Sequence, residues 1–244
     1  DIIAQAQSGT GKTGAFVVGS LELIDEKVKE TQVIIISPTR ELSRQTYNVV
    51  NAISQFSEIT AQLLIGGTSP DTDKDLLTNN IPHIVIGCPG RIYDMIRRKY
   101  LKTTEIKFLV LDEADEMLSA GFKDQIYKIF QFMNNDVQLG LFSATMPDEL
   151  NMLTSKFMRN PIKILEKREM LTLQGIAQFY IALDNDEHKY ATLKDLFGTL
   201  TISQAIIYCN SIKRVNDLYD AMLHDKFPVT RTHSGLDEAE RKKV

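Results

Sequence analysis

The amino-acid sequence predicts an α/β fold, in which a parallel sheet with helices on both faces is followed by part of a second domain of the same kind. Short apolar runs, rich in β-branched residues, alternate along the chain with longer segments of helical periodicity. Several runs are apolar at consecutive positions, as expected for strands that helices cover on both faces. In folds of this class, ligands bind at the carboxyl ends of the strands.

The first domain is predicted at residues 1–165. Its strands are expected at residues 1–4, 33–36, 62–65, 84–86, 108–111 and 139–142. Its helices are expected at residues 14–28, 41–56, 91–98, 122–133 and 148–157. A polar stretch then predicts a linker at residues 166–175. The alternation restarts in a second, truncated domain at residues 176–244, with strands at 179–181, 205–208 and 229–232 and helices at 188–200 and 212–223.

Composition excludes several classes of protein. The 244 residues are 43% hydrophobic and 25% charged, close to the globular average, which excludes a disordered or fibrous chain. No apolar run approaches the roughly 18 residues of a membrane span, so no membrane association is expected. Cys88 and Cys209 lack a C-x-x-C partner, so we expect reduced thiols in an intracellular protein and no zinc site. The net charge of -4 leaves any nucleic-acid contact to locally placed groups.

The strand at residues 1–4 leads into a loop that is suited to bind phosphate. The spacing matches a Walker A loop, except that Ala6 replaces its first glycine. Gly9 and Gly11 would let backbone N–H groups turn toward phosphate oxygens. Lys12 would reach the β and γ phosphates, and Thr13 would offer its hydroxyl to Mg²⁺. An ordinary strand-to-helix turn with a surface lysine is the alternative, but strand, loop and helix follow in the required order. The predicted nucleotide-binding residues are Ala6, Gln7, Ser8, Gly9, Thr10, Gly11, Lys12 and Thr13.

The apolar strand at residues 108–111 ends in the acidic cluster Asp112-Glu113-Ala114-Asp115. A carboxylate at the end of a buried strand, in a chain with a phosphate loop, is what Mg²⁺ coordination requires. We assign the metal to Asp112 and the attacking water to Glu113, which would orient or deprotonate it. Taken alone, such a cluster is more often a solvated helix start.

A set of motifs, in this order and separation, resembles that of the DEAD-box RNA helicase family. The motifs are A-Q-S-G-T-G-K-T (6–13), P-T-R-E-L (38–42), G-G (66–67), C-P-G-R (88–91), D-E-A-D (112–115) and S-A-T (143–145). The resemblance covers the whole chain and implies RecA-like domains that use ATP and Mg²⁺ to bind single-stranded RNA and separate short duplexes. Within the family, the intervening sequence is most similar to the branch that acts in translation initiation.

The resemblance also implies roles for individual residues. The residues implied to contact the RNA backbone are Pro38, Thr39, Arg40, Gly66, Gly67, Pro89, Gly90, Arg91, Asn210 and Arg241. Glycines permit close approach, and helix N-termini present N–H groups to phosphates. Without the resemblance, Arg40 and Arg91 would be interpreted as surface residues at helix starts, and Asn210 as a helix N-cap. Ser143 and Thr145 are implied to couple hydrolysis to RNA separation, through hydrogen bonds to the acidic cluster. The alternative is that these two hydroxyls only form local hydrogen bonds at the end of the strand and have no role in coupling.

Departures from the family pattern predict altered activity. Cys88 stands where the family has threonine, which removes a hydroxyl hydrogen bond on the RNA side of its loop. Glu238 stands where the family has glutamine, which predicts weaker or altered RNA binding by the second domain. The chain starts at Asp1, directly before an apolar strand, and stops inside a helical pattern, so we expect a piece of a longer protein. Because the family's arginine fingers belong to motifs beyond Val244, these 244 residues alone are expected to be nearly inactive as an ATPase.

Different classes of function compete. The first is an ATP-dependent RNA helicase that hydrolyses ATP and unwinds short duplexes during translation initiation, in the cytoplasm. The alternative is an ATP-dependent RNA clamp of the exon-junction complex with little turnover, in the nucleus. A P-loop ATPase that acts on DNA or protein is disfavoured by the P-T-R-E-L and S-A-T motifs. Expected partners are single-stranded RNA, RNA duplexes and a translation-initiation scaffold protein, and apart from these partners we expect a monomer.

Overall fold

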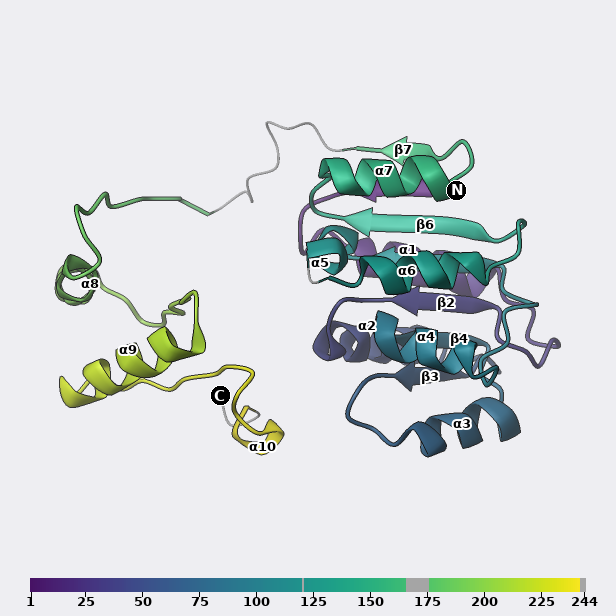
Figure 1. Cartoon of the computed structure of the whole chain (residues 1–244), viewed down its shortest axis with the longest axis horizontal. Coiled ribbons are helices and arrows are strands. Elements are labelled where there is room, and N and C mark those ends of the chain that lie inside the picture. Colours follow the sequence, from purple (N-terminus) through teal and green to yellow (C-terminus); the bar gives the residue numbers. More distant parts are fainter. Residues whose placement is uncertain (120, 166–175, 242–244) are drawn as a thin grey trace. The chain divides into compact units, whose positions relative to one another are not determined.

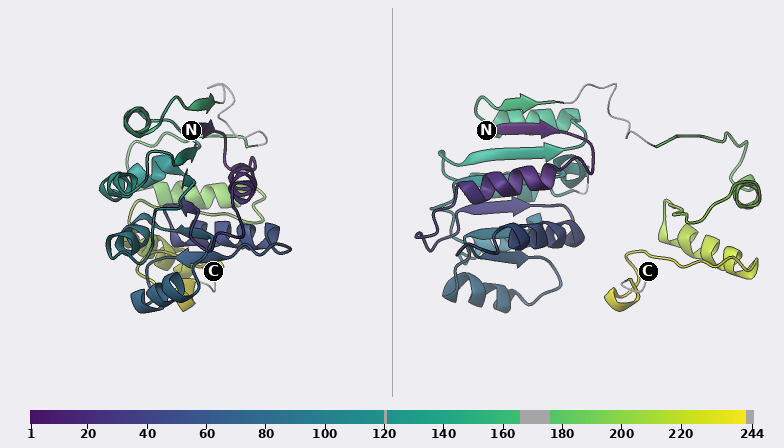
Figure 2. Two further views of the ribbon diagram at one scale, coloured as in Figure 1. Left: turned by 90° about the vertical axis from the view of Figure 1, so that its right-hand side faces the viewer. Right: turned by 180° about the vertical axis from the view of Figure 1, so that it is seen from behind.

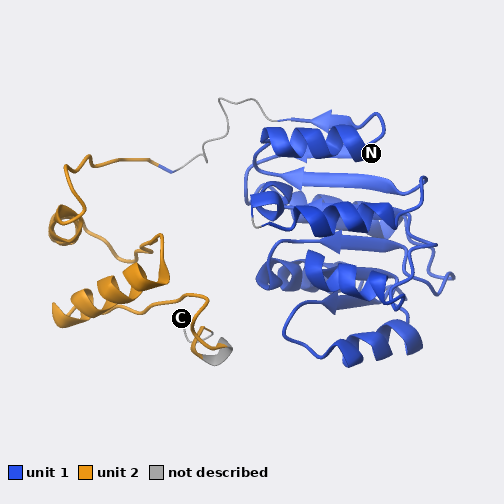
Figure 3. Ribbon diagram, in the orientation of Figure 1, with its two compact units in different colours: residues 1–176 blue, residues 177–244 orange. Residues whose placement is uncertain are grey.

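The computed structural model describes residues 1–119, 121–165 and 176–241. The chain divides into two compact units, Asp1–Ile176 and Ala177–Val244 (Figure 3). The linker predicted at residues 166–175 lies outside the described residues and stays a prediction. No helix among the described residues is both long and apolar enough to cross a membrane.

The first unit is built on a seven-stranded sheet in which every pair of neighbours is parallel (Figure 1). The strand order is β3-β4-β2-β5-β6-β1-β7. The strands are β1 (Ile2–Gln5), β2 (Val33–Ile36), β3 (Ala61–Leu64), β4 (Ile84–Gly87), β5 (Phe108–Asp112), β6 (Gln138–Ser143) and β7 (Ile162–Ile164). Strands β1 to β6 confirm the predicted ranges to within one residue at each end. The edge strand β7 was not predicted, because it is short and its side chains are exposed.

Helices cover both faces of this sheet (Figure 2). One face carries α1 (Lys12–Glu22) and α2 (Arg40–Ile53), which bury Phe16, Val17 and Val50 against it. The other face carries α4 (Pro89–Arg97), α6 (Lys123–Gln131) and α7 (Asp148–Phe157), together with the short α5 (Ala114–Ser119). Strands β2, β4 and β5 are buried at every position, which explains their continuous apolar runs.

Strand register brings distant motifs to one edge of the sheet. Gln5 at the end of β1 lies opposite Ser143 at the end of β6, and Asp112 at the end of β5 lies opposite Phe142. The phosphate loop, the acidic cluster and the S-A-T segment therefore meet at the carboxyl edge, where ligands of parallel sheets bind.

Several helices differ from the predictions: α5 was not predicted, and the helix expected at residues 41–56 ends at Ile53. The helix expected at residues 14–28 ends at Glu22. Gln32, which is fully buried, explains this end: its side chain accepts from the Asp25 backbone N–H and donates to the carbonyl oxygens of Asp25 and Val28, which takes these groups away from a helix. Helix α3 (Pro70–Asn79) was not predicted, although Ser69 as N-cap followed by Pro70 is a typical start signal.

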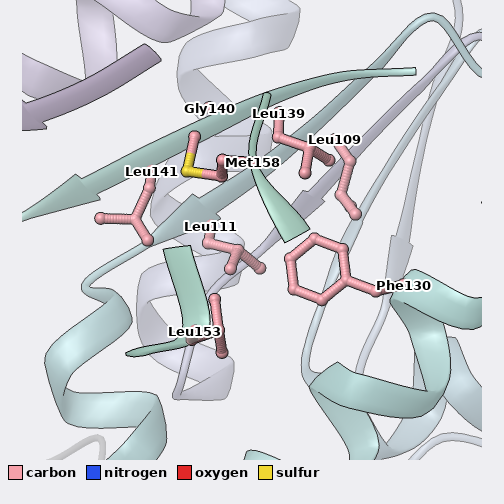
Figure 4. A pocket seen from close by; sticks show the side chains of 8 residues that line it. All are labelled: Leu109, Leu111, Phe130, Leu139, Gly140, Leu141, Leu153 and Met158. Carbon is pink, nitrogen blue, oxygen red and sulfur yellow. The ribbon is translucent and has the colours of Figure 1, made fainter. Parts of the chain in front are cut away.

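A small apolar cavity of about 10 Å³ lies in the core between β5, β6 and helices α6 and α7 (Figure 4). It is lined by Leu109, Leu111, Phe130, Leu139, Gly140, Leu141, Leu153 and Met158. It has room for about one water molecule and offers that water no side-chain polar partner, so it belongs to the packing of the core.

The second unit contains α8 (His188–Thr199), α9 (Ile212–His224) and the short α10 (Glu238–Arg241). The first two confirm the predicted helices. The strands predicted at 179–181, 205–208 and 229–232 were wrong, since residues 176–241 contain no strand. A strand requires a neighbour for its backbone hydrogen bonds and a core for its side chains. Phe179, Tyr180 and Tyr208 are about nine-tenths exposed, so these segments lack a core to pack against.

Candidate functional site

The loop between β1 and α1 has the backbone conformation of a phosphate cradle. Gly9 and Gly11 both have left-handed backbones, with φ of +80° and +94°. Side chains other than glycine rarely adopt such angles, and a Cβ at either position would have open space, so the backbone angle explains the glycines. Gly11 is the N-cap of α1 without a side-chain cap. The N-terminal N–H groups of α1 are therefore available to an anion.

Lys12 connects this loop to the acidic cluster. Its ammonium group donates to the carbonyl oxygens of Ala6, at 2.7 Å, and Gln7, at 3.2 Å. It also lies 3.7 Å from the Glu113 carboxylate, and its side chain is only 8% exposed. A largely buried cation that is held by loop carbonyls and one carboxylate fits a role in binding phosphate oxygens.

Asp112 is a buried carboxylate beside this cation. It is 4% exposed, and burial, together with the neighbouring charge of Glu113, raises its pKa to about 6, although Lys12 opposes the shift. A divalent cation would offset the cost of this buried negative charge. In the described part of the chain, no three His, Cys, Asp or Glu side chains form a metal site. Mg²⁺ needs none, because one or two protein ligands complete its shell with water and phosphate oxygens. The buried carboxylate of Asp112 therefore has the chemistry of a Mg²⁺ ligand.

Glu113 has a left-handed backbone with φ of +49°, which is uncommon for a residue other than glycine. This conformation turns the chain from β5 into α5 and brings the Glu113 carboxylate near Lys12. Residues in such backbone regions cluster at functional sites.

The predicted link between the S-A-T segment and the acidic cluster is made by one of its two hydroxyls. Thr145 donates to the Asp115 carboxylate at 2.5 Å. Burial raises the pKa of Asp115, but hydrogen bonding, chiefly from the Thr145 hydroxyl and also from the Glu116 backbone N–H, lowers it by more, so the net pKa lies below its usual value. The Ser143 hydroxyl is fully buried and makes no hydrogen bond of ordinary geometry.

Two motifs with predicted RNA contacts meet at Arg40. Thr39 caps α2 by accepting from the Leu42 backbone N–H at 3.2 Å, so Arg40 is the first residue of that helix. The Arg40 guanidinium packs against the turn at Gly66 and Gly67, where a Cβ on Gly67 would lie 2.8 Å from Arg40 Nη1. Gly67 also has φ of +92°. Only glycine fits this position without strain.

The next predicted RNA motif begins α4. Cys88 is the N-cap without a side-chain hydrogen bond to the helix, and its thiol lies 3.7 Å from the Ser43 hydroxyl. Pro89 is buried at the first helical position, and Gly90 is exposed. Both cysteines, Cys88 and Cys209, are free thiols, which agrees with their predicted state.

Arg91 has partners that sequence reasoning missed. Its guanidinium forms an ion pair with Asp73 on α3 and donates to the hydroxyl and the carbonyl oxygen of Thr68. The Arg91 and Asp73 side chains are only 11% and 3% exposed. The predicted RNA contact of Arg91 stays a prediction, and nothing in the sequence pairs these residues.

The remaining predicted RNA residues belong to the second unit. Asn210 is exposed and is not the cap of α9, because Ser211 accepts from the Arg214 backbone N–H at 3.2 Å. Arg241 is the last residue of α10. Their predicted contacts with RNA stay predictions.

Comparison with known proteins identifies relatives over almost the full length of the chain. The family model of the DEAD/DEAH box helicases matches residues 1–153. The ATP-dependent RNA helicase eIF4A of Pyricularia oryzae is 50% identical over 241 residues, which span 99% of this chain and 61% of that relative. The same-named protein of Neurospora crassa is 49% identical, and the match spans 60% of its length. The chain thus spans about three fifths of these relatives.

Solved structures show the same fold. Saccharomyces cerevisiae Dbp5 bound to RNA and ADP BeF3 matches with a TM-score of 0.87 and 34% identity, over 100% of this chain and 61% of that one. A DEAD box protein from the hyperthermophile Methanococcus jannaschii matches with a TM-score of 0.66 and 31% identity, over 100% of this chain and 64% of that one. The first unit has the RecA-like fold of these proteins, and the chain belongs to the DEAD/DEAH box helicase family.

Proposed function

We propose that the protein containing this chain is an ATP-dependent RNA helicase of the initiation factor 4A type. The observation that carries the proposal is the position of Lys12. Its largely buried ammonium group contacts both the phosphate loop and the acidic cluster. A bound triphosphate would replace the carbonyl oxygens of Ala6 and Gln7 as partners of Lys12. The names of the close relatives support the same activity and give the exon-junction alternative no support.

Each site residue has a proposed task. The N–H groups at the start of α1 bind phosphate oxygens, and Lys12 binds those of the β and γ phosphates. Mg²⁺, when bound, neutralises charge on the phosphates, and the Thr13 hydroxyl and Asp112 would hold it. Glu113 orients the attacking water and accepts its proton.

RNA binds through its backbone in this proposal. The predicted contacts at Thr39, Gly66, Gly67 and Gly90 use N–H groups and close backbone approach, which carry no base sequence. The hydrogen bond from Thr145 to Asp115 connects the acidic cluster to β6 and supports a role in coupling. We propose a monomer in the cytoplasm that a scaffold protein of translation initiation binds.

Steady-state ATP hydrolysis by the full-length protein, with and without single-stranded RNA, tests the proposal. Glu113→Gln should lower the RNA-stimulated rate of ATP hydrolysis at least about 100-fold, because a general base accelerates such a reaction by about 10²- to 10⁴-fold. Glu116→Gln is the matched control, since this acid is exposed on the same short helix. An unchanged rate for Glu113→Gln would contradict the role of Glu113 as the base. Absence of RNA stimulation in the unaltered protein would overturn the proposed helicase function.

Replacing the RNA by DNA of the same sequence tests the substrate class. We expect weaker binding to DNA, because the 2′-hydroxyl is the group that distinguishes the two backbones. Equal affinity for both would favour a different nucleic-acid substrate.

A further inference from the structure

A single guanidinium joins three segments next to the predicted RNA surface. Arg91, in the first turn of α4, donates from Nη2 to the carbonyl oxygen of Thr68 at 2.8 Å and from Nη1 to the Thr68 hydroxyl at 3.1 Å. Nη1 also forms the ion pair with Asp73 in the first turn of α3. Thr68 follows Gly66 and Gly67 directly, so Arg91 ties the end of this glycine turn to both helices.

Asp73 is an unusual residue for this location. A carboxylate close to a surface that binds phosphates repels them, and Asp73 is also 2% exposed, so its charge is poorly solvated. Burial raises the pKa of Asp73, and the hydrogen bond and the charge of Arg91 oppose this rise only in part. A buried carboxylate of this kind is tolerated because its partner holds it, and removal of either partner leaves an unpaired charge in the interior.

The glycine turn is fixed from its other side as well. The Arg40 guanidinium packs against Gly66 and Gly67, and a Cβ at Gly66 would lie 3.2 Å from its Nη2. The turn at residues 66–68 is therefore held by Arg40 at its start and by Arg91 at its end. Of these two arginines, Arg91 is held by a buried counter-charge, and its guanidinium is committed to protein partners.

We propose that Asp73 is a positioning residue for RNA binding, which fixes Arg91 and thereby holds the Gly66–Thr68 turn in the shape that receives the RNA backbone. The inference rests on the proposed function, since it assumes that RNA binds there. Arg91 then acts through the turn and not by contact with a phosphate.

The sign of one mutational effect distinguishes this role from simple electrostatics. Asp73→Asn removes a negative charge, so charge alone predicts tighter RNA binding. If Asp73 positions Arg91, the opposite is expected. Asp73→Asn should then lower the affinity of the full-length protein for a single-stranded RNA oligonucleotide about tenfold, as expected when a charged hydrogen bond is lost. Asp75→Asn, an exposed acid on the same helix, should leave the affinity unchanged or slightly raise it. Unchanged or tighter binding by Asp73→Asn would overturn the inference.

The salt dependence of binding tests the role of Arg91. Loss of a phosphate contact reduces the slope of log affinity against log salt by about 0.7 per phosphate for a single strand. We expect Arg91→Gln to weaken binding without changing this slope. A reduced slope would show a direct phosphate contact and overturn the positioning role.

A double variant covers the case in which Asp73→Asn fails to fold. Asp73→Asn combined with Arg91→Gln leaves no unpaired charge, and it should bind RNA no more weakly than Arg91→Gln alone, because both changes release the same turn. Additive losses would contradict the inference. Affinity for ADP should be unaltered in every variant. If the unaltered protein does not bind RNA, the proposed function fails; if only the Asp73 effects are missing, the positioning role alone fails.

Discussion

The ammonium group of Lys12 lies 3.7 Å from the carboxylate of Glu113, and the two side chains are 8% and 22% exposed. Lys12 follows β1 through the phosphate loop and Glu113 directly follows β5, and these strands are not neighbours, because β6 lies between them. The parallel order of β1, β6 and β5 aligns their carboxyl ends. The sheet thus places the phosphate-binding group and the proposed base side by side.

Lys12→Ala should weaken nucleotide binding by about 10- to 100-fold, because charged hydrogen bonds contribute about 1.5–3 kcal/mol. Titration with a fluorescent ADP derivative measures the effect. Lys27→Ala is the control, since Lys27 is exposed in the loop after α1. Affinity within about twofold of the unaltered protein would contradict the role assigned to Lys12.

Asp112 should make the ligand-free protein less stable as pH rises. Its folded-state pKa of about 6 lies above the ordinary value of 3.8, so between these values the folded protein binds a proton that the unfolded chain has released. The free energy of unfolding therefore falls across this window, by roughly 3 kcal/mol in all. Asp112→Asn carries no such charge and should unfold several degrees higher at about pH 7.5, with the difference vanishing below about pH 4.

Thermal unfolding at both pH values, without Mg²⁺ or nucleotide, checks the Asp112 prediction. Asp136→Asn, at an exposed position, should show no comparable gain. A gain for Asp112→Asn of equal size at both pH values would exclude titration of this carboxyl as its cause. The same variant should lose Mg²⁺-dependent hydrolysis, because an amide is a weaker ligand than a carboxylate.

Gly87→Ala should destabilise the first unit by about 3 kcal/mol, the upper range for overpacking. A Cβ there would lie 2.0 Å from the carbonyl oxygen of Leu64, which is backbone of the paired strand β3, so the two strands would have to shift apart. Gly90→Ala is the contrast, since a Cβ at Gly90 meets nothing within 4 Å. That change should be neutral or stabilise by about 0.4–1 kcal/mol, because alanine restricts the unfolded chain more than glycine does.

Chemical denaturation of the two glycine variants measures these differences. Similar midpoints for both would contradict the packing argument. Gly90→Ala should nevertheless weaken RNA binding, because the proposed contact depends on close backbone approach at the start of α4. RNA affinity equal to that of the unaltered protein would place the RNA elsewhere.

Thr145→Val should separate duplex unwinding from ATP hydrolysis. The change removes the donor of the 2.5 Å hydrogen bond to Asp115 without a large change of shape. We expect the unwinding rate to fall about tenfold more than the RNA-stimulated ATPase rate, since the lost charged hydrogen bond is equivalent to about 1.4 kcal/mol or more. Thr104→Val, in an exposed loop, is the control. Equal loss of both rates would contradict the coupling role.

Strands and chemical motifs of the first unit were readable from the sequence. The run Val33–Ile36 is β-branched throughout and forms a strand at the predicted residues. Its β-branched side chains prefer a strand, and all four positions are buried in the sheet. The phosphate loop was predictable because each of its parts is encoded by neighbouring residues: a strand, glycines with positive φ and a helix start. The acidic cluster was located because it directly follows a buried strand.

Only the tertiary structure decided the contacts between distant residues. Asp73 and Arg91 meet because α3 and α4 follow neighbouring strands, and no local pattern records that pairing. Gln32, which directly precedes β2, binds the backbone of Asp25 and Val28 after the end of α1, and the strands predicted in the second unit do not form. Local sequence sets the preference of a segment, whereas the hydrogen-bonding neighbours and the core that realise or override this preference come from residues far along the chain.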